Sequence, residues 1–279
     1  MAPRGTASPL TSPMRVGNDV VDLGHPRTRS RPEGDRLPRR ILAPGELDRV
    51  EGMEPGVERD RLLWTHWAGK ETAFKVVSKL LGSPPVFEHR AFELSHLREK
   101  GRCGRIIELE GRVRWQEVEV CIEGVVSDEF IHMVGWGPLG RSGRPVVEMG
   151  VEGSSPHDEE PPDDPGDQEP EAGASQRESL TARSHLSRRA RLLARSRLAG
   201  HLRVMARTDH AHSDASSAPD PRIEILTSPE APGRSPPRVI VDGIHRPELD
   251  LSLSHHGRYI GWAILLPREG FGRGSPETS

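Results

Sequence analysis

The segment from Gly140 to Gln176 divides the chain, because it is rich in Gly, Pro, Ser, Asp and Glu and holds almost no apolar residue after Val151. Such a segment cannot offset its chain entropy by burying side chains. The 279-residue chain is also only 33% hydrophobic and contains 26 Pro and 29 Gly, which leaves less core than its length suggests. We therefore predict an α+β protein with two lobes joined by a disordered acidic linker, residues 139–180.

The first lobe is predicted to cover residues 16–138. Val16–Leu23 has the apolar character of a buried strand, and Pro38–Glu51 and Arg59–Leu81 have helical patterns. The longer helix should stop at Gly82, which is followed by Ser83, Pro84 and Pro85. Between Arg105 and Gly137 apolar and polar residues alternate, with turn residues between the runs, as in an antiparallel sheet.

The second lobe is predicted to cover residues 181–267. It begins with a basic helix, Ser184–Val204, whose leucines and alanines form one apolar stripe. Strands should follow at Ile223–Leu226, Arg238–Val241 and Leu249–Leu266. Two halves that each combine a helix with an antiparallel sheet indicate a possible pseudodimer, and residues 1–15 and 268–279 are predicted to be disordered tails.

Three apolar segments each carry polar groups suited to a metal ion or a phosphate. Asp19 interrupts the strand VGNDVVDL, where an unpaired carboxylate would cost several kcal/mol, so it must be paired, hydrogen-bonded or metal-bound. Glu71 and Lys75 lie four apart in the helix WTHWAGKETAFK and share one face, although a plain surface pair has the same spacing. Ser254 and His255 interrupt the last apolar run, where a strand end would also explain them.

This trio, in this order, resembles the 4′-phosphopantetheinyl transferase superfamily, and within it the holo-acyl-carrier-protein synthase type more than the surfactin-synthetase-activating type. In the synthase type the aspartate strand comes first, the lysine–glutamate helix second and the serine–histidine strand last. Gly34–Glu46, the position of Arg61 before Lys70 and Glu71, and pieces of Arg222–Tyr259 are similar to further family segments. The resemblance covers about half of the chain, in pieces.

The resemblance implies transfer of the 4′-phosphopantetheine arm from coenzyme A, as a substrate, to a serine of an apo acyl or peptidyl carrier protein. Mg²⁺ would be held by Asp19 and Glu71, because it prefers oxygen ligands and two carboxylates commonly suffice beside waters and phosphates. Glu71 would also serve as the base, and Lys75 would stabilise phosphate charge. The coenzyme would be bound by Lys70, Arg61, Ser254 and His255. Lys70 points about 100° away from Glu71, so a structural role is its alternative.

Partners and location follow partly from composition. Two cysteines without C-x-x-C spacing indicate a reducing compartment, and no apolar run approaches the ~20 residues of a membrane span, so we expect a cytoplasmic protein without a membrane partner. An acidic carrier would need a basic docking face, which Arg27, Arg29, Arg31, Arg39 and Arg40 could supply. Fatty-acid, polyketide and nonribosomal-peptide carriers present the same serine. The oligomeric state is open between a monomeric pseudodimer and a trimer.

Two rival hypotheses remain. The helix after the linker carries eight arginines between Arg183 and Arg207 with no acid among them, as a non-catalytic nucleic-acid-binding or interaction protein would. The helix lacks interleaved aromatic residues, and its apolar stripe favours packing on a sheet. An inactive relative kept for interaction is the second rival, against which the retained Asp19, Glu71, Lys75 and His255 argue.

Overall fold

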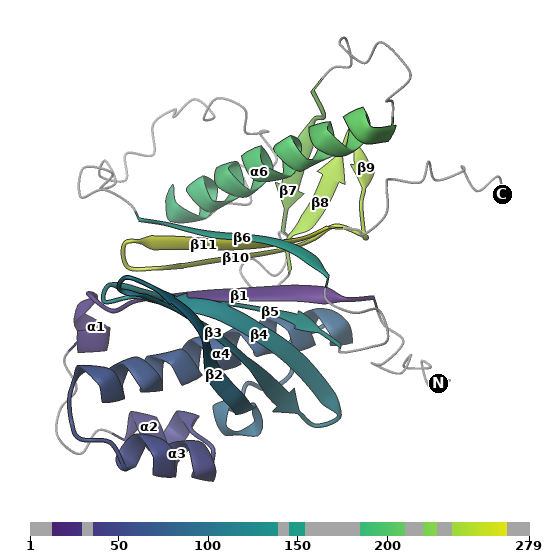
Figure 1. Ribbon diagram of the computed structural model, residues 1–279. Helices are drawn as coiled ribbons and strands as arrows, with labels where there is room; N and C mark the ends of the chain where they lie inside the picture. Colours follow the sequence, from purple (N-terminus) through teal and green to yellow (C-terminus); the bar gives the residue numbers. More distant parts are fainter. Residues whose placement is uncertain are drawn as a thin grey trace, which may run out of the picture.

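The computed structural model describes residues 13–29, 36–138, 145–153, 185–209, 220–227 and 236–266. Two lobes are stacked one above the other in Figure 1, with strand β1 (Arg15–Asp22) of the first lobe beneath β10 (Asp250–His256) and β11 (Tyr259–Leu266) of the second. The predicted α+β class is confirmed. The tails predicted at 1–15 and 268–279 lie outside the described residues, except for residues 13–15.

The first lobe is a five-stranded antiparallel sheet with the order β1-β5-β4-β3-β2 and a long helix, α4 (Val57–Leu81), across one face. Its remaining elements are α1 (Pro26–Arg29), α2 (Leu37–Ile41), α3 (Pro44–Glu51), the 3₁₀ helix η2 (His89–Ala91), β2 (Glu93–Cys103), β3 (Ile106–Trp115), β4 (Val118–Val126) and β5 (Phe130–Gly137). The core between α4 and the sheet contains Ala73, Val76, Val113, Val120 and Ile131, all fully buried. This core fixes α4 against β1 and β5.

Helix boundaries in this lobe follow local chemistry. Helix α4 ends as predicted at Gly82, which adopts a left-handed φ of 71° that glycine accepts without strain. The single helix predicted for Pro38–Glu51 is two helices, because Pro44 begins α3 and disfavours a helical conformation at Ala43. Ala43 is extended, with φ −67° and ψ 160°.

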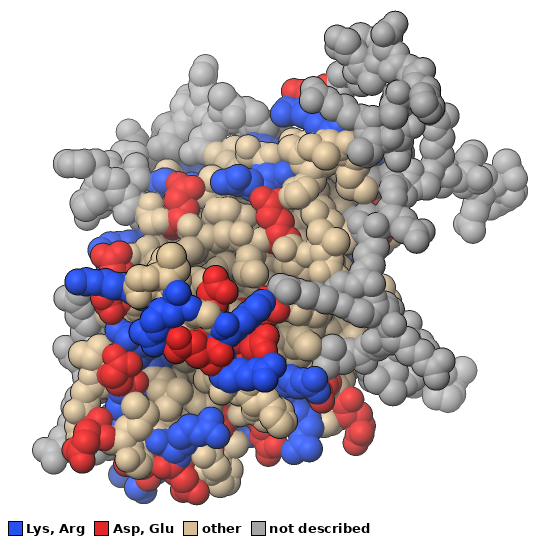
Figure 2. Space-filling view, viewed as in Figure 1, with Lys and Arg blue, Asp and Glu red and all other residues tan. Residues whose placement is uncertain are grey.

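Charged side chains of both signs are interspersed over strands β2 to β4. Figure 2 shows blue and red side chains alternating on the first lobe, and several of them form cross-strand pairs. These pairs are Arg98 with Glu110, Arg112 with Glu119 and Arg114 with Glu93. This face is therefore not a field of a single charge.

The second lobe contains a three-stranded sheet, β10-β11-β6, a small sheet, β7-β8-β9, and helix α6 (His185–Asp209). The strands other than β10 and β11 are β6 (Val146–Gly153), β7 (Ile223–Leu226), β8 (Arg238–Val241) and β9 (Ile244–His245). The predicted apolar stripe is confirmed in α6 at Ala190, Leu198 and Leu202, which are buried. None of the helices in the described ranges is long and apolar enough to cross a membrane.

Two predictions about this lobe need correction. Residues 146–153, assigned to the disordered linker, form strand β6, which pairs antiparallel with β11. Its apolar residues are few but alternate with Glu148, Gly150 and Glu152, a period that an average over the long acidic segment conceals. Leu249–Leu266 is a hairpin of two strands, turning at Gly257, whose φ is 55°. The rest of the predicted linker lies outside the described residues, apart from residue 145.

Both lobes repeat one order of elements. Each begins with a strand, continues with a 25-residue helix and ends with antiparallel strands. In each, the first strand pairs with the last one, β1 with β5 and β6 with β11, and the last strand pairs with the one before it. The described parts of the lobes therefore share this order of elements and these strand pairings, a partial common topology that their sequences do not reveal. The first lobe has one five-stranded sheet, whereas the second has two three-stranded sheets.

Candidate active site

Strand β1 lies between the two lobes, and its alternating side chains separate two environments. Asp19 and Val21 face α4, where Gly17 lets the strand approach closely: a Cβ at Gly17 would collide with the carbonyl oxygen of Thr72. Asn18 and Asp22 contact the second lobe instead. The period of two in the strand thus assigns neighbouring polar residues to opposite sides.

Lys75 joins α4 to β1 at the polar end of this contact. Its Nζ donates to Oδ1 of Asp19 at 2.9 Å and to the backbone carbonyl of Asn18 at 2.7 Å. The Lys75 side chain is 29% exposed and that of Asp19 is 15% exposed. The pair is partly buried but remains open to solvent and to ligands.

The Asp19 carboxyl group is poised between its two charge states. Burial raises its pKa to about 6, the nearby Glu71 carboxylate adds to that rise, and the Lys75 ammonium opposes it. The effect of Glu71 places the two carboxylates in one electrostatic site. Asp19, Glu71 and Lys75, predicted together from sequence, are brought together by the fold.

The chemistry of this cluster fits a hard divalent cation. The Glu71 carboxylate raises the pKa of Asp19, an unfavourable contact that a cation beside Asp19 would relieve, and carboxylate oxygens are the ligands that Mg²⁺ prefers. Among the described residues, no group of three or more His, Cys, Asp and Glu side chains gathers as a metal site. The chemistry of the two carboxylates Asp19 and Glu71 would suit an ion that completes its shell with water and substrate phosphates.

Strand β10 faces β1 with a row of polar side chains at every second position: Asp250, Ser252, Ser254 and His256. Asp250 and Ser252 accept hydrogen bonds from the backbone N–H groups of Val16 and Asn18, and Nδ1 of His256 accepts from that of Asp22. The Ser254 hydroxyl accepts from the Asn18 amide at 2.8 Å. We refer to these four residues as the polar row.

The predicted pair Ser254 and His255 is split by the strand period. Ser254 is buried against β1, whereas His255 is exposed and its Nε2 lies 3.4 Å from the Ser187 hydroxyl of α6. Partial burial of the His255 ring lowers its pKa, and the Lys75 ammonium lowers it further. The charge of Lys75 therefore acts on His255, while Ser254 joins the lobes.

Two predicted coenzyme ligands lie elsewhere. Lys70 is fully buried, with Nζ 2.6 Å from Oε2 of Glu46 and 3.1 Å from the carbonyl oxygen of His89. Of its two alternatives, these contacts favour the structural role. Arg61 pairs with Glu58 and Asp128, ten positions before Glu71 and therefore about 15 Å away along the helix. We assign Arg61 to the β4–β5 turn.

The sequence analysis missed the buried ion pair between Lys79 and Asp250. Nζ of Lys79 lies 3.0 Å from Oδ2 of Asp250 and donates to the carbonyl oxygens of Val16 and Leu251, both at 2.7 Å. Lys79 extends the helical row of Glu71 and Lys75 by one turn, and Asp250 begins the polar row. Both periodicities were signals available in the sequence.

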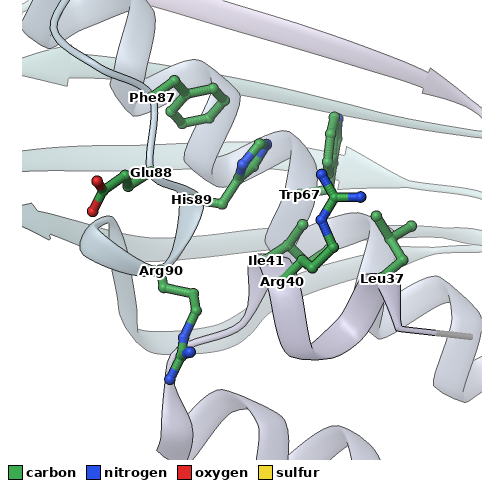
Figure 3. A pocket seen from close by; sticks show the side chains of 8 residues that line it. All are labelled: Leu37, Arg40, Ile41, Trp67, Phe87, Glu88, His89 and Arg90. Atoms are coloured by element: carbon green, nitrogen blue, oxygen red, sulfur yellow. The ribbon is translucent and has the colours of Figure 1, made fainter.

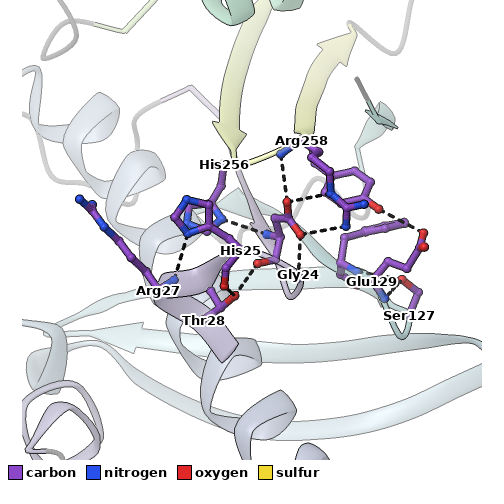
Figure 4. Close-up of polar contacts among 11 residues, drawn as sticks. Gly24, His25, Arg27, Thr28, Ser127, Glu129, His256 and Arg258 are labelled. Atoms are coloured by element: carbon purple, nitrogen blue, oxygen red, sulfur yellow. Dashed lines mark hydrogen bonds and ion pairs between the residues drawn. The ribbon is translucent and has the colours of Figure 1, made fainter. Parts of the chain in front are cut away.

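Asp22 closes the other end of the contact between the lobes, where its partners Gly24, His256 and Arg258 are labelled in Figure 4. Its Oδ1 accepts from Gly24 N–H at 2.7 Å, which caps the turn that follows β1. Its Oδ2 accepts from the backbone N–H of Arg258 at 3.0 Å, and the Arg258 guanidinium holds the pKa of Asp22 below its ordinary value, against the opposing effect of burial.

A pocket lies beside the cluster, next to Trp67 of α4. It is lined by Trp67, Phe87 and His89 with Leu37, Ile41, Arg40, Glu88 and Arg90 (Figure 3). Nε2 of His89 lies 3.7 Å from Oε1 of Glu71, and both side chains are 22% exposed. The pocket therefore shares a wall with the candidate site.

The fold and the Asp19–Glu71–Lys75 cluster define a two-lobed α+β protein with an acidic site suited to a divalent cation and phosphate groups. Residues 15–126 match the model of the 4′-phosphopantetheinyl transferase superfamily, and this segment belongs to that superfamily. The match covers β1 to β4 and includes all three residues of the cluster. No curated protein matches the chain. The resemblance is thus confirmed for the superfamily, which supports a transferase that moves phosphopantetheine.

Proposed function

We propose that this protein transfers the 4′-phosphopantetheine arm of coenzyme A to a serine of an apo acyl or peptidyl carrier protein in a Mg²⁺-dependent reaction. The observation that carries the proposal is the convergence of Asp19, Glu71 and Lys75 within the segment that matches the superfamily. The serine oxygen attacks the β-phosphate and forms a new P–O bond. The bond to 3′,5′-adenosine bisphosphate breaks, and the serine proton passes to a base.

Asp19 and Glu71 are the proposed holders of Mg²⁺, which would supply positive charge to the pyrophosphate oxygens when bound. Glu71 is also the proposed base for the serine proton. Lys75, already within 2.9 Å of Asp19, has a partly exposed ammonium that can turn to a phosphate oxygen and stabilise the leaving charge. Asp19 would then bind Mg²⁺ in place of the Lys75 ammonium.

The nucleotide of coenzyme A is proposed to bind near His255 rather than Ser254. His255 is exposed and electrostatically coupled to Lys75, whereas the Ser254 hydroxyl is buried on the Asn18 amide. The earlier assignments of Lys70 and Arg61 to the coenzyme receive no support from their internal ion pairs. The proposed coenzyme site is therefore reduced to His255 beside the cluster.

Carrier docking and subtype are further parts of the proposal. Arg27 and Arg40 are exposed on the elements that follow β1, where an acidic carrier could meet them, while Arg39 pairs with Glu51. The synthase type is supported by the order of the motifs, and a cytoplasmic location by two free, separate cysteines. The shared topology of the lobes supports a monomeric pseudodimer, which light scattering would distinguish from a trimer.

The nucleic-acid alternative loses support from the use of arginines on α6. Arg189 pairs with Glu152, Arg203 pairs with Asp220, and Arg191 donates to the Ser187 carbonyl and the Thr227 hydroxyl. Internal partners of this kind reduce the charge available for phosphates of a nucleic acid. Filter binding at physiological salt would test this alternative directly.

Intact mass spectrometry tests the proposal. An apo carrier protein incubated with the protein, coenzyme A and Mg²⁺ should gain the mass of one phosphopantetheine, and EDTA should prevent the gain. A panel of fatty-acid, polyketide and peptide carriers would define the substrate. A folded protein that modifies none of them, with or without Mg²⁺, would reject the proposed function.

A further inference from the structure

The ring of His89 is held in a fixed plane beside Glu71. It lies between Phe87 and Trp67, with ring centroids 3.9 and 4.5 Å away, as Figure 3 shows. Phe87 is itself stacked on Phe74 of α4 at 4.3 Å. Aromatic packing on both sides leaves the imidazole little freedom to rotate.

The Nε2 atom of this ring has no hydrogen-bond partner within the described part of the chain. The carboxylate atom facing it is Oε1 of Glu71, at 3.7 Å. This separation is longer than a hydrogen bond, and a small rotation of the Glu71 side chain would close it. A buried polar atom aimed at a candidate catalytic carboxylate calls for a functional explanation.

The backbone of His89 is anchored to the helix that carries Glu71. Its carbonyl oxygen accepts a hydrogen bond from Nζ of Lys70 at 3.1 Å. Lys70 is fixed by Glu46, whose carboxylate also accepts from the N–H groups of Ala43 and Leu94, at 2.7 and 2.6 Å. Lys70 is thus linked to the site by its hydrogen bond to the His89 backbone, although its own side chain points away from Glu71.

We propose that His89 is a positioning residue that orients the Glu71 carboxylate through Nε2, with Lys70 holding His89 in place. The inference rests on the proposed transferase function, in which Glu71 binds the metal ion and accepts the serine proton. His89 touches no reacting atom in this scheme. It limits the rotamers of Glu71, so that less of the carboxylate's freedom is lost when the substrates bind.

A matched pair of substitutions separates the role of Nε2 from packing. In His89→Gln the amide nitrogen of the new side chain can occupy the position of imidazole Nε2, whereas the shorter side chain in His89→Asn cannot reach it. Both variants lose the aromatic ring. We expect kcat to fall 10- to 100-fold in His89→Asn, a typical loss for partners that orient a ligand, and to fall less in His89→Gln. KM for coenzyme A should change by less than about threefold in both.

Binding of Mn²⁺, followed by its electron paramagnetic resonance signal, gives a readout that does not need turnover. The dissociation constant should rise in His89→Asn relative to the parent and be restored in part in His89→Gln. Val86→Ala is the control in the same segment, because the Val86 side chain is exposed, and both quantities should stay at parental values in that variant. Circular dichroism would verify that each variant is folded.

The outcomes separate the inference from the function. An active parent with equal kcat and Mn²⁺ affinity in the Gln and Asn variants would overturn the positioning role and leave the transferase function standing. A parent that neither modifies a carrier nor binds Mn²⁺ would overturn both. Recovery in His89→Gln alone would support the role of Nε2.

Discussion

The two faces of β1 differ in how their carboxylates are paired and how deeply those pairs are buried. The face toward α4 carries Asp19, whose pKa is raised to about 6 and whose one cationic contact in the cluster, Lys75, is partly exposed. The face toward the second lobe meets the polar row of β10, and Lys79 makes contacts to two carboxylate oxygens and two carbonyls there. One strand thus separates a site with an electrostatically destabilised carboxylate from an interface rich in hydrogen bonds, although Oδ1 of Asn18 has no hydrogen-bond partner among the described residues there.

This difference shows how a single strand can serve two purposes. The interface is buried and rich in hydrogen bonds, so it can hold the lobes together and keep β1 in place. The cluster keeps unfavourable electrostatics that a bound cation would relieve, which is a common property of functional sites. Substitutions on the two faces should therefore separate activity from stability.

Glu71→Gln should have the largest effect and should act on activity alone. The change removes a metal ligand and a base with almost no change in volume, so we expect turnover to fall about 10²- to 10⁴-fold. Carrier modification followed by intact mass gives the rate, and the urea midpoint should stay at the parental value. Full turnover by a folded Glu71→Gln protein would show that the α4 face of β1 is not catalytic.

Lys79→Met should have the opposite profile. It leaves the Asp250 carboxylate buried without its cation, and breaking a buried pair costs about 3–5 kcal/mol in the free energy of unfolding. Urea unfolding measures this loss. The matched control is the double variant Lys79→Met with Asp250→Asn, which removes both charges and should lose less. A single variant as stable as the parent would contradict the role of the interface.

Asp19→Asn should raise the stability of the metal-free protein. The pKa of this carboxyl group rises from 3.8 to about 6 on folding. Its contribution to the stability of the folded protein is therefore fully present below pH 3.8 and is lost as the pH increases through about 6. The variant should therefore gain on the parent between pH 4 and pH 8, by up to about 3 kcal/mol. Urea unfolding at both pH values in EDTA measures the gain. A variant less stable than the parent at pH 8 would contradict the proposed electrostatic destabilisation by the Asp19 carboxylate.

His132 of β5 lies beside Asn18, with Nε2 3.3 Å from the Asn18 amide nitrogen, and His132→Gln should give the smallest change. Burial, followed by the Lys75 charge, lowers the pKa of His132 to about 3, so the folded protein stays neutral at this residue while the unfolded chain takes up a proton below pH 6.5. The contribution of neutral His132 to the stability of the folded protein is therefore fully present above pH 6.5 and is lost as the pH falls below that value. The parent should lose about 2 kcal/mol more than the variant between pH 7 and pH 5. Equal losses in the two proteins would contradict the lowered pKa of His132.

Local pattern was sufficient for most of the fold. The helical period over Arg59–Leu81 and the glycine after it predicted α4, and alternation predicted the strands between Arg105 and Gly137. It failed where a short element was hidden by its surroundings, as in β6, or where a turn divided a uniform run, as between β10 and β11. Pairing with distant strands decided both cases.

The sequence by itself determined that Glu71 and Lys75 share a helical face and that Asp19 occupies a buried strand, because these facts follow from the geometry of one element. Only the tertiary structure decided which face of β1 each residue meets. It paired Lys70 with Glu46, Lys79 with Asp250 and Ser254 with Asn18, and it placed His89 beside Glu71. The contacts of Lys79 and Ser254, the latter 236 positions from Asn18, depend on how the two lobes pack, and those of Lys70 and His89 depend on packing within the first lobe; no local period specifies either.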